Sequence, residues 1–168
     1  MERITVFMVK TSLMYFVTGF LLGAAMLITK GLGYIWLTAV FMPTHSHLLL
    51  VGWLVQFVMG IAYWILPRRR TAELPLGYSG KLAFTVYGML NVGLVLRVVF
   101  EPMQIALPQT SPVDGVFLTV SGILQGVAGL LWMYQMWQRA RPFTEVRARA
   151  EAMMAQGETA DTTRGQDS

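Results

Sequence analysis

Four long apolar runs limit what this chain can fold into. They cover residues 4–29, 44–66, 80–100 and 115–137, and few charges interrupt them. A helix of roughly 20 apolar residues spans the hydrocarbon core of a bilayer. Lipid offers the backbone no hydrogen-bond partner, so a spanning segment must satisfy its own N–H and C=O groups. The runs therefore predict an all-α fold, an integral membrane four-helix bundle whose first partner is the lipid bilayer.

The composition supports a membrane protein. Hydrophobic residues make up 55% of the chain and charged residues only 13%, and the mean hydropathy is +0.53. A soluble domain carries about 25% charged residues, so this chain has too little charge to cover a water-soluble surface. We read the net charge of +4 as a mark of topology, and we expect no nucleic acid partner.

The basic residues predict the orientation. Of the 13 Lys and Arg residues, only Lys30 and Arg97 would lie on one side of the membrane, and the remaining eleven on the other. Basic loops stay in the cytoplasm, so both termini are expected inside and the loops 30–43 and 101–114 outside. We expect a multi-pass protein of a bacterial-type inner membrane, with a four-span membrane domain over residues 1–140. Residues 141–168 would form a basic, partly disordered cytoplasmic tail with one short helix.

The chain has two histidines, His45 and His47, and both stand at the head of the second run. Ionisable residues in a span are costly and mark functional sites by default. The bland alternative is that both meet water among the lipid headgroups. Residues two apart on an α-helix point about 200° away from each other, so a regular helix would send the two side chains to different places.

The alternative to separate roles is that the two histidines bind one copper ion together. If Pro43 makes the backbone irregular, His45 and His47 could share a metal ion, with Met42 as a soft third ligand suited to copper. The absence of cysteine excludes thiolate metal sites and covalent haem attachment through a CxxCH motif.

The stretch HSHLLLVGWLVQFVMGIAYWILPR resembles the second helix of the large subunit of haem–copper oxidases, especially the nitric oxide reductase branch. A histidine opens that helix, an apolar stretch with Trp follows, and a Phe–Met–Gly–Ala–aromatic pattern leads to a closing proline. The matching residues in this chain are His45, Leu48, Leu49, Trp53, Phe57, Met59, Gly60, Ala62, Tyr63 and Pro67. The resemblance covers one of the four predicted spans.

The resemblance implies that His45 is an axial ligand of a low-spin haem b. His47 falls where the reductase branch often has Asn, so its role does not transfer. The family's binuclear centre needs more histidines than the two present, so an electron-transfer haem is the most that this chain would carry. A six-coordinate haem needs a second axial group, which favours a homodimer. His45 of both copies would then share one haem, or His45 and His47 of the partner subunit would hold two haems per dimer. A methionine of the same chain is the remaining choice.

Arg97 is the third candidate site residue. It lies near the outer end of the third run, and its guanidinium suits a haem propionate because Arg binds carboxylates in a bidentate fork. The alternatives are an i, i+4 pair with Glu101 and snorkelling to the interface. For Gln56, Asn91 and Gln125 we expect hydrogen bonds between helices, and for Tyr63 and Trp64 a place in the interfacial belt.

Three functions from different classes follow. The first is a membrane haem b protein that transfers electrons, as a homodimer or as a subunit of a respiratory complex, with a quinone or a cytochrome c as redox partner. The second is an outer-face copper-binding, delivery or sensor protein that uses His45 and His47. The third is a structural subunit of a respiratory complex without a cofactor.

Overall fold

The computed structural model describes residues 2–66, 77–107, 112–137, 139 and 140, and the single positions Thr144, Ala148 and Met154. Within these residues the chain is helical. Helix α1 covers Arg3–Gly31, and α2 (Ile35–His47), the π-helix η1 (Leu48–Val55) and α3 (Gln56–Ile65) follow one another without a break. Helix α4 covers Gly80–Ala106 and α5 covers Pro112–Trp137.

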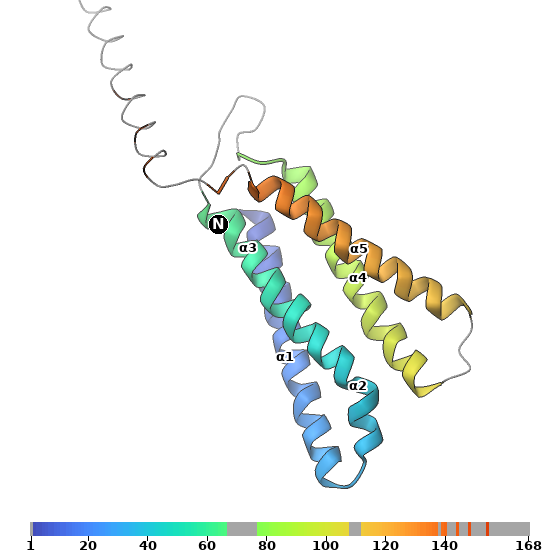
Figure 1. Cartoon of the computed structure of the whole chain (residues 1–168). Helices are drawn as coiled ribbons and strands as arrows, with labels where there is room; N and C mark the ends of the chain where they lie inside the picture. The colour runs from blue at the N-terminus through green and yellow to red at the C-terminus, as the bar shows by residue number, and fades with distance from the viewer. Residues whose placement is uncertain are drawn as a thin grey trace, which may run out of the picture.

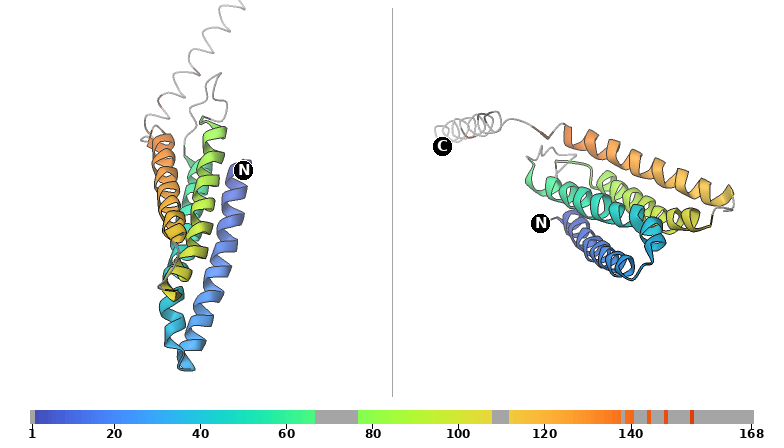
Figure 2. Two further views of the ribbon diagram at one scale, coloured as in Figure 1. Left: turned by 90° about the vertical axis from the view of Figure 1, so that its right-hand side faces the viewer. Right: turned by 60° about the horizontal axis from the view of Figure 1, so that its bottom comes forward.

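The described residues contain four helices that are long and apolar enough to cross a membrane, which confirms the all-helical part of the predicted fold. Their bounds are Arg3–Gly31, Ile35–Ile65, Gly80–Ala106 and Val113–Trp137. Figure 1 shows two hairpins, one of α1 with α2–η1–α3 and one of α4 with α5. In Figure 2, α1 and α5 lie on opposite sides of the molecule, with the other two spans between them.

Two predicted loops are wrong. Residues 35–43 continue the second span as helix, and residues 101–106 continue the third. The reason is that IWLTAVFMP is apolar enough to stay in lipid as helix, and helices in membranes tolerate a proline such as Pro43 or Pro102. The predicted tail over residues 141–168 lies outside the described residues, except for three single positions.

The connection between α1 and α2 is a tight turn centred on Gly33. Gly33 has a φ of 90°, a left-handed conformation that glycine adopts without a Cβ clash. Its N–H donates to the Lys30 carbonyl, and the N–H of Tyr34 donates to the Thr29 carbonyl. This pair of bonds is a Schellman motif, and it returns the chain directly into α2.

The second span buries every fourth residue from Val40 to Gly60. The buried positions are Val40, Thr44, Leu48, Gly52, Gln56 and Gly60. On a regular α-helix, four residues turn through about 400°, so such a row drifts by about 40° at each step. The wider turns of a π-helix reduce this drift. The η1 segment therefore keeps the row against α1 along the whole span.

A polar chain joins three of the spans at mid-depth. Asn91 donates to Gln56 Oε1 at 2.9 Å and accepts from the Tyr15 hydroxyl at 2.9 Å. Gln56 is fully buried and donates to the Met8 carbonyl. The prediction of interhelical bonds is confirmed for Gln56 and Asn91. It is wrong for Gln125, which bonds to Ser121 of its own helix.

Candidate functional site

His45 is fixed against α1 by its own ring. Its Nδ1 lies 2.9 Å from the Gly19 carbonyl oxygen, and a carbonyl only accepts hydrogen bonds, so Nδ1 carries the proton. The other ring nitrogen, Nε2, is then the lone-pair nitrogen. Nε2 has no hydrogen-bond partner among the described residues.

Gly19 and Gly23 make this close approach feasible. A Cβ on Gly23 would lie 2.6 Å from Cε1 of His45, and one on Gly19 would lie 2.8 Å from Cδ2 of Leu49. Gly19 and Gly23 form a GxxxG pair, one of two in the spans, and this pair serves packing within the chain. The second pair, Gly122 and Gly126, meets nothing within 4 Å, so that side of α5 is uncovered in the described part of the chain.

A groove of about 500 Å³ runs along the α1–α2 hairpin beside His45. We call it the His45 groove, and it is lined by Phe20, Gly23, Ala24, Met26, Leu27, Lys30, Thr38, Met42, His45 and Leu49. Its walls are apolar, and Lys30 is its one charged residue. Phe20 and Leu27 are 64% and 72% exposed, so the groove opens toward the surroundings of the bundle.

The structure does not bring His47 to the same place. His47 Nδ1 lies 2.9 Å from the Pro43 carbonyl oxygen of its own helix, and His47 does not line the His45 groove. The helix is continuous from Ile35 to His47, so the irregular backbone that a shared copper site needs is not formed at Pro43. Of the three residues proposed to bind copper, His45 and Met42 line the groove and His47 does not.

The Arg97 guanidinium already forms a bidentate ion pair with Glu101. Its Nε and Nη2 donate to the two carboxylate oxygens of Glu101 at 3.0 and 2.9 Å. This is the i, i+4 pair that the sequence offered as an alternative. The propionate contact of Arg97 stays a prediction, because a carboxylate ligand would have to share the guanidinium with Glu101.

Two residues of the site were missed or undervalued from the sequence. Lys30 counted only as an outer charge, yet it lines the groove with His45. Gly23 belongs to a GxxxG pair, which indicates close helix packing but does not show that the glycine faces the imidazole. The spacing of Gly19 and Gly23 ahead of a Gly33 turn is the signal that could have placed them opposite His45.

Two further observations concern metal binding and Tyr63. Among the described residues, no group of three or more His, Asp or Glu side chains could hold a metal ion. Tyr63 is fully buried and accepts a hydrogen bond from Gln135, so its predicted place in the interfacial belt is wrong.

Comparison with protein families, with curated proteins and with solved structures gives no match. The function is therefore argued from the geometry of the groove.

Proposed function

We propose that this protein binds haem b in the His45 groove and carries electrons within the membrane. The observation that carries the proposal is the bond from His45 Nδ1 to the Gly19 carbonyl. Metal-binding histidines usually donate their second ring nitrogen to a carbonyl or a carboxylate, which fixes the tautomer and the ring orientation. His45 has this arrangement, and its Nε2 keeps a lone pair for iron.

The groove fits the chemistry of a haem. A porphyrin is a flat apolar ring with two carboxylates at one edge, and the groove combines apolar walls with the ammonium of Lys30. His45 would hold the iron, Lys30 would attract a propionate, and Phe20 and Leu49 would keep water from the ring. A bound haem would supply one-electron transfer.

The second axial ligand would come from another copy of the chain. The groove is open on the side that faces away from the bundle, where Phe20 and Leu27 are mostly exposed. One chain therefore covers only part of a porphyrin. His45 of the partner subunit would complete the coordination across a two-fold axis. Met42 of the same chain is the alternative ligand, because it lines the groove and is 52% exposed.

The proposed setting is a bacterial-type inner membrane with both termini in the cytoplasm, as a homodimer or a respiratory-complex subunit, with a quinone or a cytochrome c as redox partner. The basic residues support this orientation.

Because the chain has no cysteine, single-cysteine labelling tests the orientation without background labelling. Leu32→Cys in the α1–α2 turn should react with an impermeant reagent in intact cells, and Lys81→Cys at the start of α4 only after lysis. Labelling of Lys81→Cys in intact cells and of Leu32→Cys only after lysis would reverse the orientation, and labelling of both in intact cells would contradict the crossing of the second span.

The visible spectrum of the purified protein tests the cofactor. We expect a Soret band and split α/β bands on reduction. His45→Ala should remove these bands, whereas the matched variant His47→Ala should retain them, because His47 bonds only to its own helix. Added imidazole should restore the bands to His45→Gly. Bands that survive in His45→Ala would refute the assignment.

Two further measurements separate the alternatives. Elemental analysis that finds copper without haem would favour the metal delivery or sensor function, and the absence of both would favour a structural subunit. Native mass spectrometry in mild detergent should show a dimer that retains haem. A monomer that holds six-coordinate haem would move the second ligand to Met42.

A further inference from the structure

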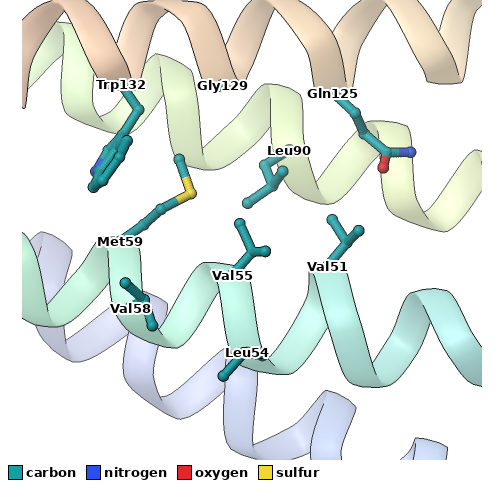
Figure 3. Close-up of a pocket in the computed structure, with 9 residues that line it drawn as sticks. All are labelled: Val51, Leu54, Val55, Val58, Met59, Leu90, Gln125, Gly129 and Trp132. Carbon is teal, nitrogen blue, oxygen red and sulfur yellow. The ribbon is translucent and has the colours of Figure 1, made fainter.

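A second cavity, separate from the His45 groove, lies between the second span and α5. We call it the central cleft, and it has a volume of about 510 Å³. Figure 3 shows Val51 of the second span and Gly129 of α5 on its two walls, with Leu90 of α4 between them. Helix α5 packs mainly against α4 and barely touches α3, which leaves the cleft open. Apart from Gln125, the walls of the cleft are apolar.

The Arg97–Glu101 ion pair stands on the α4 face that forms the floor of this cleft. Arg97 follows Leu90 by seven residues and Glu101 follows it by eleven. Both spacings bring an α-helix back to within about 20° of the same direction, so the pair lies roughly 10–17 Å beyond Leu90 along α4. The side chains are 31% and 18% exposed, and neither lines the His45 groove.

A second carboxylate stands at the same end of the cleft, on α5. Asp114 precedes Gln125 by eleven residues, so it lies within about 20° of the face that α5 turns to the cleft. The rings of Phe100 and Phe117 stack with their centroids 4.4 Å apart, which holds the two helices together beside Glu101 and Asp114. The guanidinium and two carboxylates therefore stand at this end, which we call the mouth of the cleft.

Arg97 has hydrogen-bond donors left over at this depth. A guanidinium carries five N–H groups. Two of them donate to Glu101, and the other three have no partner among the described residues. In the hydrocarbon layer neither water nor an acyl chain can accept from them.

The headgroup layer is within reach of this side chain. The 27 residues of α4 span about 40 Å, roughly 10 Å more than the hydrocarbon core, so each end of the helix extends about 5 Å among the headgroups. Arg97 stands nine residues before the end of α4, just below this layer, and long basic side chains extend toward it. The nearest acceptors for its remaining donors are lipid phosphates.

We propose that the central cleft binds one phospholipid whose headgroup carries a primary amine, such as phosphatidylethanolamine. Its phosphate accepts from Arg97, because guanidinium pairs with phosphate as it does with carboxylate. Its ammonium donates to Glu101 and Asp114, and one acyl chain follows the apolar walls from Leu90 toward Gly129. A zwitterionic headgroup thus meets opposite charges at both of its ends. The site is independent of haem at His45, and its test does not use the visible spectrum.

Native mass spectrometry of the full chain in mild detergent tests the headgroup. Phosphatidylethanolamine should bind saturably, with one lipid per chain. Phosphatidylcholine has no N–H on its ammonium, and phosphatidylglycerol has no cation. Each should bind about tenfold more weakly, which is the effect of about one charge-assisted hydrogen bond. Equal binding of the three lipids by the wild type would show unspecific lipid only and would overturn the proposal without any variant.

Variants at the mouth test the individual contacts. Arg97→Gln removes the phosphate donors and should weaken phosphatidylethanolamine binding about tenfold, whereas Lys81→Gln removes an exposed cation at the other end of α4 and should bind as the wild type does. Glu101→Gln combined with Asp114→Asn should abolish the preference for the amine over phosphatidylcholine. Unchanged affinity of Arg97→Gln, or a preference retained in the double variant, would contradict these contacts.

The acyl chain is tested at the other end of the cleft. Gly129→Leu should abolish binding, because a Cβ there meets nothing within 4 Å and the longer side chain fills the cleft. Gly126→Leu makes the same change on α5 at a position that does not line the cleft, and it should bind as the wild type does. Retained binding to Gly129→Leu would place the lipid elsewhere. A wild type that binds no phospholipid at saturation would refute the proposal and leave the cleft to a partner helix.

Discussion

Arg139 donates to the carbonyl oxygen of Leu66 at 2.6 Å, although 73 residues separate them. A second bond reaches the Tyr63 carbonyl at 3.2 Å, and the guanidinium stands 5.2 Å from the centre of the Tyr78 ring. The last carbonyls of a helix have no partner within the helix. A residue just beyond α5 therefore caps the end of α3, and it fastens the two hairpins at the end of the bundle that holds the N-terminus (Figure 1).

Replacing Arg139 with Met should loosen this end of the bundle. The change keeps the side chain long but removes the donors to both carbonyls, and we expect a loss of about 2 kcal/mol in the free energy of unfolding, as for other buried charge-assisted bonds. Detergent-based unfolding followed by circular dichroism measures it. Arg3→Met removes the same charge at an exposed position and should cost less than about 0.5 kcal/mol. Equal losses would show that charge, and not capping, matters.

Gly23→Ala should disturb His45, whereas Gly126→Ala should be tolerated. A Cβ at Gly23 lies 2.6 Å from the imidazole, and at Gly126 it meets nothing within 4 Å. Overpacking of this kind costs about 1–3 kcal/mol, and alanine on an open helix face has a small favourable helix propensity. Thermal unfolding of the two variants gives the comparison. If both lose the same stability, the close approach of α1 to His45 is not as described.

The bond between Asn91 and Gln56 should appear as a coupling energy. Gln56→Leu and Asn91→Leu, alone and together, form a double-mutant cycle, and we expect coupling of about 0.6 kcal/mol, within the range found in membrane proteins. Unfolding in mixed micelles measures each variant. The pair Gln56→Leu and Gln125→Leu shares no hydrogen bond, and its effects should add. Coupling in the second pair and none in the first would contradict the network.

Tyr78 should make stability depend on alkaline pH. Burial, and then its hydrogen bond to Glu2, raise the pKa of this phenol above its usual value. The neutral form is favoured in the folded state, so its contribution is complete below the unfolded pKa of about 10 and is lost as the pH rises toward the raised pKa. The stability difference between wild type and Tyr78→Phe should be constant from about pH 7 to 9 and shrink above pH 10. A constant difference at higher pH would argue against the burial of Tyr78.

The spans could be predicted from the sequence, because crossing lipid requires long apolar helices and little else. Their ends could not. The 30–43 segment contains glycine and proline that suggest a loop, yet only a three-residue turn around Gly33 separates α1 from α2. Apolar residues beside a proline stay helical when lipid gives the backbone no alternative partner.

The candidate site was predicted only in part. His45 stood out as an ionisable residue in a span, and its separation from His47 follows from helix geometry. The contact of His45 with Gly19 and Gly23 depends on how two helices pack, which the spacing of residues in one helix does not specify. The role of Arg139 was also missed, because its position after the last span resembles that of the other basic residues that mark topology.

The number of residues in η1 sets the angle between the His45 and Gln56 side chains about the helix axis, as well as their separation along that axis. His45 must face Gly19 and Gln56 must face the Met8 carbonyl. One residue turns an α-helix by about 100° and the wider turns of η1 by less. Deleting one residue of η1 would therefore rotate His45 and Gln56 against each other, so that both contacts could not be kept. The side chains of η1 can therefore be exchanged far more freely than its length can be changed.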